Sequence, residues 1–195
     1  MDLKDQLDAA IEPWNLLDHP FYQAWNAGTL PMEALKTYAA EYGTFIAGID
    51  AGWEQVGNSE HAAEEREHAD LWRQFAATLG TDISNPKIPQ VQTLLNTAQQ
   101  LFSEPATAWG ALYAFEAQQP QTAATKLVGL DTHYQVAEPA RTYFQVHAGD
   151  LYEADMIVDE LQSVDDVTGQ TAVAACAKMS EALWDSLTGI HDQHK

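Results

Sequence analysis

Apolar residues recur three and four positions apart along almost the whole chain, and the alternating Val, Ile and Thr pattern of β-strands is absent. The clearest loop is residues 81–89, and a bend is expected at Pro120. No repeat or long linker divides the chain. We therefore predict an all-α fold, a compact bundle of seven to eight helices that forms one domain over residues 1–195. Prolines and glycines mark the expected helix ends: helices begin at Pro20 and Pro31 and end at Gly28, Gly57 and Gly80.

Composition and charge limit the classes of partner. The chain has 195 residues, 46% of them hydrophobic, which is enough for a sizeable core. No apolar run approaches the roughly 20 residues that span a bilayer, and the first residues lack the pattern of a signal peptide. The formal charge of −20 repels phosphate backbones and anionic membranes, which excludes nucleic acid and membrane as expected partners. The single cysteine, Cys176, leaves no intrachain disulfide, so we expect a cytoplasmic protein.

Three helical segments carry metal-capable side chains on apolar stripes. His68, Glu116 and His147 each share a helix face with aromatic and aliphatic residues. A carboxylate buried without a partner is costly, and the usual remedies are neutralisation, an ion pair or a metal ion. These groups therefore indicate a site in the core. A buried carboxyl bonded to Tyr, Trp or His remains the alternative for Glu116, as does a satisfied core histidine for His147.

Other polar residues lie at helical spacing from these three. Glu65 is one turn before His68, and Asp155 is eight residues after His147. Helix bundles commonly build iron or manganese sites from inward-facing Glu and His. Imidazole and carboxylate ligands suit iron or manganese with open positions for dioxygen, and one cysteine excludes a thiolate site. Further candidates near these segments are His61, Glu64 and Asp150.

Three stretches of sequence resemble a known family. Residues 16–42 (LLDHPFYQAWNAGTLPMEALKTYAAEY), 67–80 (EHADLWRQFAATLG) and 112–130 (LYAFEAQQPQTAATKLVGL) are similar to the heme-oxygenase-like superfamily that includes TenA and PqqC, and most of all to its CADD-like branch of metal-dependent oxidases. The resemblance implies a bundle with a central pocket, often as a homodimer. It also implies a two-metal iron or iron–manganese centre that activates dioxygen, without heme. The branch is linked to forming para-aminobenzoate from one of the protein's own tyrosines.

The resemblance assigns roles to five residues. His68 corresponds to a histidine ligand, Glu116 to a bridging glutamate, and His147 to the first member of a ligand triplet. Tyr22 corresponds to the sacrificial tyrosine. Lys126, ten residues after Glu116, corresponds to a lysine that acts in the same chemistry.

The chain also departs from the family pattern. The H-x-x-x-D-x-x-x-H triplet reads His147, Leu151, Asp155. The family also has a glutamate seven residues before the histidine that corresponds to His68, and this position is His61 here. The two-metal site is therefore incomplete. One ion with a weaker second position at Asp155 is feasible, as is a pocket without metal. The ligands expected for the first ion are Glu65, His68, Glu116 and His147.

We accordingly expect an oxygen-activating, iron-dependent oxidoreductase that acts on a small organic substrate or on an internal tyrosine. One alternative is TenA-like hydrolysis of a thiamin-related amine. That reaction uses a cysteine, but Cys176 lies in the last expected helix instead of mid-chain, and Glu41 would supply a carboxylate. The other alternative is a metal-free ligand-binding or interaction module.

Overall fold

The computed structural model describes residues 2–149 and 151–195, and every regular element in these ranges is helical. The prediction of an all-α fold is confirmed. The α-helices are α1 (Leu3–Ile11), α2 (Pro20–Asn26), α3 (Met32–Glu41), α4 (Gly43–Ile46), α5 (Asp50–Gln55), α6 (Ser59–Thr78), α7 (Pro89–Leu101), α8 (Pro105–Glu116), α9 (Gln119–Gly129), α10 (Thr142–His147), α11 (Tyr152–Leu161) and α12 (Asp166–Asp192).

Several long periodic segments are divided into shorter helices. Residues 31–57 form α3, α4 and α5, and residues 105–130 form α8 and α9, with Pro120 in the first turn of α9. The segment 139–162 ends its first helix at His147 and resumes at Tyr152. The described residues therefore form more and shorter helices than seven or eight. Each break changes the direction in which the next side chains point.

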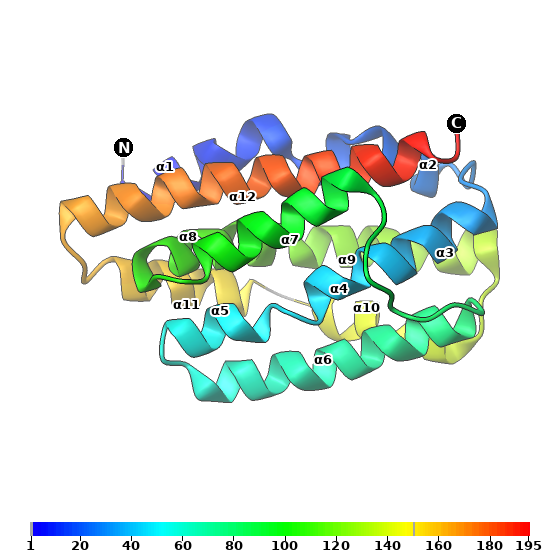
Figure 1. Ribbon diagram of the computed structural model, residues 1–195, viewed down its shortest axis with the longest axis horizontal. Coiled ribbons are helices and arrows are strands. Elements are labelled where there is room, and N and C mark those ends of the chain that lie inside the picture. The colour runs from blue at the N-terminus through cyan, green and yellow to red at the C-terminus, as the bar shows by residue number, and fades with distance from the viewer. Residues whose placement is uncertain (1, 150) are drawn as a thin grey trace.

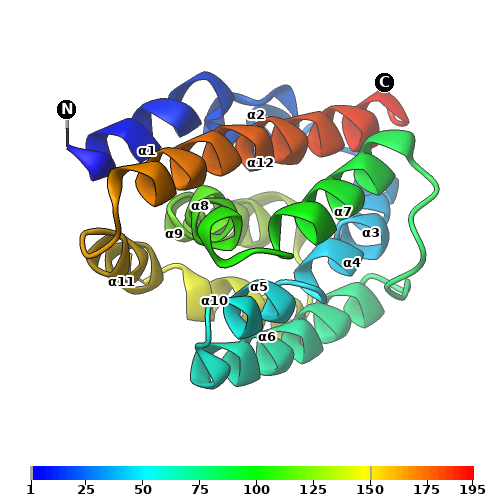
Figure 2. The ribbon, with the colours of Figure 1, turned by 60° about the vertical axis from the view of Figure 1, so that its left-hand side comes forward.

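Helix α8 is the centre of the bundle. In Figure 2, α8 and α9 lie in the middle, with α12 and α1 on one side and α5, α6 and α10 on the other. The long helix α12 runs along one side of the molecule beside α7 and α8 (Figure 1). At Gly110 the two backbones are so close that a Cβ atom would lie 1.8 Å from the Ala172 carbonyl oxygen. This close packing carries the end of α8, and with it Glu116, into the core.

The core is rich in aromatic side chains. Trp25, Trp53, Trp72, Tyr38 and Tyr143 have no exposed surface. They link the helices on both sides of α8 into one contiguous apolar cluster. Within the described ranges, no helix combines the length and apolar character needed to cross a membrane.

Candidate metal centre

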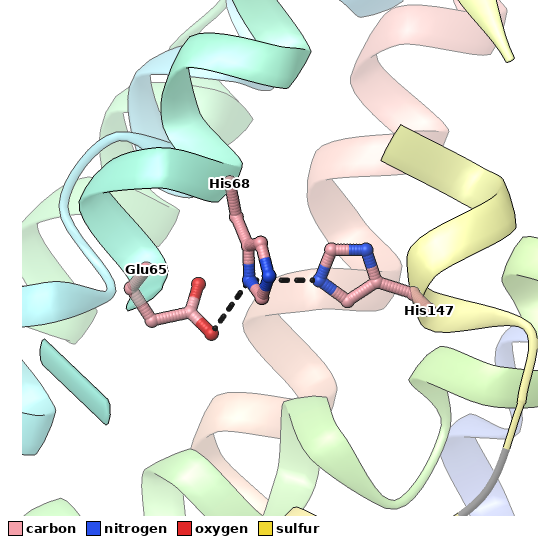
Figure 3. A group of neighbouring side chains, drawn as sticks. All are labelled: Glu65, His68 and His147. Carbon is pink, nitrogen blue, oxygen red and sulfur yellow. Dashed lines mark hydrogen bonds and ion pairs between the residues drawn. The ribbon is translucent and has the colours of Figure 1, made fainter. Parts of the chain in front are cut away.

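Glu65, His68 and His147 meet between α6 and α10. Their potential ligand atoms all lie within 4.8 Å of one another. Glu65 and His68 are one turn apart on α6, so they project from the same face toward His147 at the end of α10 (Figure 3). The Glu65 Oε1 atom is 3.3 Å from His68 Nδ1, and His147 Nε2 is 3.2 Å from the same nitrogen. The sequence prediction that these three groups converge agrees with this arrangement.

The His147 ring is oriented for coordination. Its Nδ1–H donates a hydrogen bond of 2.6 Å to the Tyr143 carbonyl oxygen, which leaves the Nε2 lone pair facing His68. Metal-binding histidines usually have their second nitrogen held in this way. Burial, with a contribution from His68, lowers the pKa of His147 to about 4. The ring is therefore neutral near pH 7, as a metal ligand must be.

The pKa of His68 shifts in the opposite direction to that of His147. Burial alone would lower its pKa, but the neighbouring Glu65 carboxylate outweighs burial, and the pKa of His68 is raised. More distant carboxylates of Glu153 and Glu64 act in the same direction. The pair of histidines therefore lies in a negative environment, which also favours a bound cation.

Two buried carboxylates each have one oxygen without the hydrogen bond that such a group normally makes. Glu65 is 6% exposed and Glu116 is 4% exposed. In the described part of the chain, Glu65 Oε2 and Glu116 Oε1 have no hydrogen-bond partner. Burial, followed by the charges of Glu65 and Glu153, raises the pKa of Glu116 well above its ordinary value. Unpaired buried oxygens need an explanation, and a metal ion would supply their missing partner.

The cavity beside these groups is small. It has a volume of about 40 Å³ and is lined by His68, Glu116 and His147 together with Gln119, Pro120, Val146 and Glu153. Each enclosed water needs roughly 10–15 Å³ of such volume, so the space holds an ion and a few small ligands. Ordinary small-molecule sites are roughly 300–1,000 Å³. The residues and the space thus fit iron or manganese with small oxygen ligands.

The carboxylate that α11 contributes to this cavity is not the one expected from the sequence. Because the helix breaks after His147, Asp155 is not on the His147 face, and its side chain is exposed. Its charge instead contributes to raising the pKa values of Lys4 and Tyr113. Glu153 takes its place in the wall of the cavity lined by His68, Glu116 and His147, which we call the metal cavity. The sequence analysis missed Glu153. Asp150 lies outside the described residues.

One feature of the sequence could have revealed the helix break after His147. Gly149 follows His147 by two residues, and glycine is common just past a helix end. A break there would have shifted the helical phase of the following residues. His61 is also not part of the cavity wall; its Nδ1 contacts the Asn58 Oδ1 atom at 3.3 Å. The side chain of His61 nevertheless packs against the Trp53 ring at the edge of this region.

Tyr22 and Lys126 lie together in a packed group of buried aromatic side chains between α2 and α9, which we call the Tyr22–Lys126 chamber. Each is 2% exposed. The Lys126 Nζ atom is 5.2 Å from the ring centroids of Tyr22 and Phe144 and 5.5 Å from that of Tyr38. In the described ranges no carboxylate forms an ion pair with Lys126, and burial lowers its pKa to about 7. A substantial fraction of this amine is therefore neutral at pH 7.

Aromatic side chains connect this chamber to the metal cavity. The Tyr143 ring lies 5.3 Å from the Phe144 ring and 4.2 Å from the His147 ring, measured between centroids. Gln119, which lines the metal cavity, donates a 2.7 Å hydrogen bond to the Tyr143 hydroxyl oxygen. Burial raises the pKa of Tyr22 well above its ordinary value, so its phenol is protonated. The two regions are thus neighbours with different chemistry.

The residues of the hydrolase alternative are not assembled. The Glu41 carboxylate accepts hydrogen bonds of 2.9–3.0 Å from the backbone N–H groups of Lys87 and Ile88 at the start of α7. Cys176 is buried in α12, and its Sγ is 3.7 Å from the Leu7 carbonyl oxygen. Burial raises the pKa of the Cys176 thiol to about 12. Both residues therefore have structural surroundings, and neither lines the metal cavity.

The sequence matches a family described as iron-containing redox enzymes over residues 46–185. The chain belongs to this family. Two relatives are named 4-aminobenzoate synthase. The one from Nitrosomonas europaea is 29% identical, with 98% of this chain and 92% of the relative covered. The one from Chlamydia pneumoniae is 29% identical, with 93% and 89% covered.

Solved structures show the same fold at lower sequence identity. A domain with a heme oxygenase-like fold from Shewanella denitrificans has a TM-score of 0.83 at 17% identity, covering 99% of this chain and 93% of its own. A TenA homologue from Pseudomonas syringae has a TM-score of 0.77 at 17% identity, with 96% and 92% covered. A CADD-like protein from Nostoc punctiforme has a TM-score of 0.65 at 14% identity, with 96% and 98% covered. The heme-oxygenase-like fold expected from the sequence is confirmed.

Proposed function

We propose that this protein is an iron-dependent, oxygen-activating oxidoreductase that forms 4-aminobenzoate from its own Tyr22. The observation that carries the proposal is the contact of Tyr22 with Lys126 in a closed aromatic chamber beside a metal cavity. The names of the relatives point to the same product. The cavity of about 40 Å³ at the metal ligands is too small for an external aromatic substrate, which favours an internal one.

The ion would be held by Glu65, His68, Glu116 and His147, with Glu153 available for a second, weaker position. When bound, iron supplies one-electron redox chemistry and the activation of dioxygen. Carboxylate and imidazole ligands with open positions suit this role, and manganese is the other candidate for the same donors. The unpaired oxygens of Glu65 and Glu116 argue against a bundle that has lost its metal.

The protein's own residues prepare the site. His147 is neutral and presents Nε2, because its Nδ1–H is bound to the Tyr143 carbonyl oxygen. Gln119 holds the Tyr143 hydroxyl at the cavity wall. The aromatic walls exclude water, so the chamber around Tyr22 protects reactive species from solvent.

Tyrosine is a chemically reasonable precursor of 4-aminobenzoate. Its ring already carries a carbon substituent and a heteroatom opposite each other. Conversion requires cleavage of the Cα–Cβ bond of Tyr22, oxidation of Cβ to a carboxyl group with dioxygen as oxidant, and replacement of the phenolic oxygen, which leaves as water, by nitrogen. Lys126 is the buried amine in contact with this ring, and its lowered pKa makes part of it nucleophilic at pH 7. For Lys126 to supply the nitrogen, its own Cε–Nζ bond must also break.

Isotope labelling tests the proposal. The protein is produced with ring-¹³C tyrosine, loaded with iron, and exposed to oxygen and a reductant, and released 4-aminobenzoate is measured by mass spectrometry. We expect one fully ring-labelled product per chain at most, with a matching mass loss at Tyr22. Tyr22→Phe should abolish the product, whereas Tyr134→Phe should preserve it. Unlabelled product, or no product at full iron content, would overturn the proposal.

We further propose, by analogy with the CADD-like branch, that the protein acts as a homodimer in the cytoplasm. Light scattering of the purified protein tests the assembly, and a monomer at micromolar concentration would contradict it. Fractionation of the source cells tests the location. Neither property is needed for the chemistry at Tyr22.

A further inference from the structure

A second cavity lies on the other side of the α8–α9 junction. Its volume is about 290 Å³, and it is bounded by residues of α1 and the following turn and by the start of α9. Gln119 and Pro120 line the metal cavity, whereas Gln118, Gln121 and Thr122 line this cleft. The first turn of α9 is therefore the wall between the two cavities.

Thr122 connects the cleft with the chamber of Tyr22. Its side chain is 3% exposed, and its hydroxyl donates a 3.1 Å hydrogen bond to the Gln119 carbonyl oxygen next to the Tyr22 phenol. Thr122 and Lys126 are four residues apart on α9, so both side chains are on the helix face that packs against α2. One side chain thus separates the Tyr22–Lys126 chamber from a solvent-open cleft.

The sizes of the two cavities differ in a way that matters for an aromatic ring. A cavity of roughly 150 Å³ is enough to hold benzene. The cleft of about 290 Å³ exceeds this volume, and the metal cavity of about 40 Å³ does not reach it. A ring released from Tyr22 can therefore be accommodated on the cleft side and not on the metal side.

The charge of the cleft is also relevant. The carboxylate of Glu12 lies along it, next to that of Asp8, which is paired with Lys4 at 2.7 Å, and the whole chain has a formal charge of −20. An anionic ligand is repelled by such surroundings and is not retained. The cleft is consequently better suited to releasing an aromatic acid than to storing one.

We propose that this cleft is the port by which the aromatic acid formed from Tyr22 leaves the protein, with Thr122 as its inner wall. The identity of the product rests on the proposed function. The port itself is a feature of the fold, and its existence can be tested without turnover.

Acetylation of Lys126 by acetic anhydride reports on access. The neutral amine attacks a carbonyl carbon, the C–O bond breaks, acetate leaves, and the amine proton passes to buffer. Peptide mass spectrometry gives the rate at Lys126, and exposed Lys178 serves as internal reference. Gln121→Trp fills the cleft mouth. Gln99→Trp is the matched control, because Gln99 lines a separate groove of about 240 Å³ beside α7.

We expect Gln121→Trp to slow acetylation of Lys126 at least fivefold, with Gln99→Trp and the Lys178 rate unchanged. Glu12→Trp, which fills the cleft from the opposite wall, should have the same effect if Gln121→Trp folds poorly. An unreactive Lys126 in the unmodified protein overturns the port, as does equal labelling in all variants with native circular dichroism.

Product release gives a second readout. After iron loading and oxygen exposure, Gln121→Trp should retain at least fivefold more 4-aminobenzoate after rapid filtration than Gln99→Trp. Equal retention overturns the release role. If Gln121→Trp slows acetylation of Lys126 but Tyr22 of the unmodified protein is not consumed after iron loading and oxygen exposure, the port stands and only the proposed reaction is refuted.

Discussion

Glu41 and Glu116 are two buried glutamates with opposite surroundings. They are 7% and 4% exposed. The Glu41 carboxylate accepts hydrogen bonds from two backbone N–H groups at the start of α7. Glu116, at the end of α8, has an oxygen without a partner and faces a cavity with two histidines. Burial alone therefore does not distinguish a structural carboxylate from a ligand, whereas the hydrogen bonds around it do.

The first prediction tests the structural side of this comparison. Glu41→Ala leaves the N–H groups of Lys87 and Ile88 without their acceptor, so we expect the free energy of unfolding to fall by about 3 kcal/mol. Metal content should be unchanged. Urea denaturation and elemental analysis of the same preparation measure both quantities. A loss of metal in this variant would contradict the separation of the two regions.

The second prediction tests the ligand side. Removing a supporting group near a metal usually costs 10–100-fold in affinity, so removing a ligand in His147→Ala should cost roughly 100-fold or about 2.7 kcal/mol. Anaerobic competition with a chelator measures the affinity for iron(II). His133→Ala, which removes a histidine bonded to the Asn26 carbonyl oxygen, is the control and should bind normally. Equal affinities in the two variants would refute the ligand set.

Lys126 extends the comparison to a buried cation. Its pKa is lowered by burial, so the unfolded chain binds a proton at higher pH than the folded protein does. Stability is therefore lost as pH falls from about 10.5 toward about 7. Lys126→Met should raise the free energy of unfolding by about 2 kcal/mol at pH 7. Urea titrations at pH 7 and 9.5 should show this gain shrinking at the higher pH, and a constant gain would argue against the buried charge.

The smallest expected effect is that of Glu116→Gln, which should change the free energy of unfolding in the opposite direction to Glu41→Ala. The pKa of Glu116 is raised, so the metal-free protein loses stability as pH rises from the ordinary carboxyl range toward that higher value. Glu116→Gln removes this loss and should stabilise the metal-free protein by about 1 kcal/mol at pH 7. Its iron affinity should fall. Glu41→Gln, the matched control, should be destabilised, and the same sign in both variants would remove the contrast.

Much of the fold was predictable from local signals. The periodicity of apolar residues defined the helices, and glycines with positive φ at positions 28, 57 and 80 lie where helices were expected to end. His68 and Glu65 were correctly placed together because a fixed helical spacing relates them. His147 and Glu116 required tertiary contacts that one sequence does not contain. Their convergence came from the inward faces of separate helices and from the family resemblance.

The prediction was less successful where a helix ends. Asp155 is the last position of the family triplet, whose spacing from His147 assumes one continuous helix, and the break before Tyr152 invalidates that spacing. Glu153 is consequently the cavity carboxylate from α11. Periodicity fixes the relative direction of side chains only while the backbone dihedral angles remain helical. The hydrogen bonds that give Glu41 a structural role are formed with residues 46 and 47 positions away in the sequence and leave no local signal.

If Tyr22 is consumed as proposed, its position in α2 limits how often one molecule can act. Excision of its side chain at the Cα–Cβ bond would leave glycine in a seven-residue helix and an empty space in the core. Large core truncations cost roughly 3–5 kcal/mol, and glycine within a helix costs about 1 kcal/mol more. These losses are a large part of the stability of an ordinary domain. A spent chain would thus be marked for proteolysis by its own weakened packing, and cellular output would be set by the rate of protein synthesis.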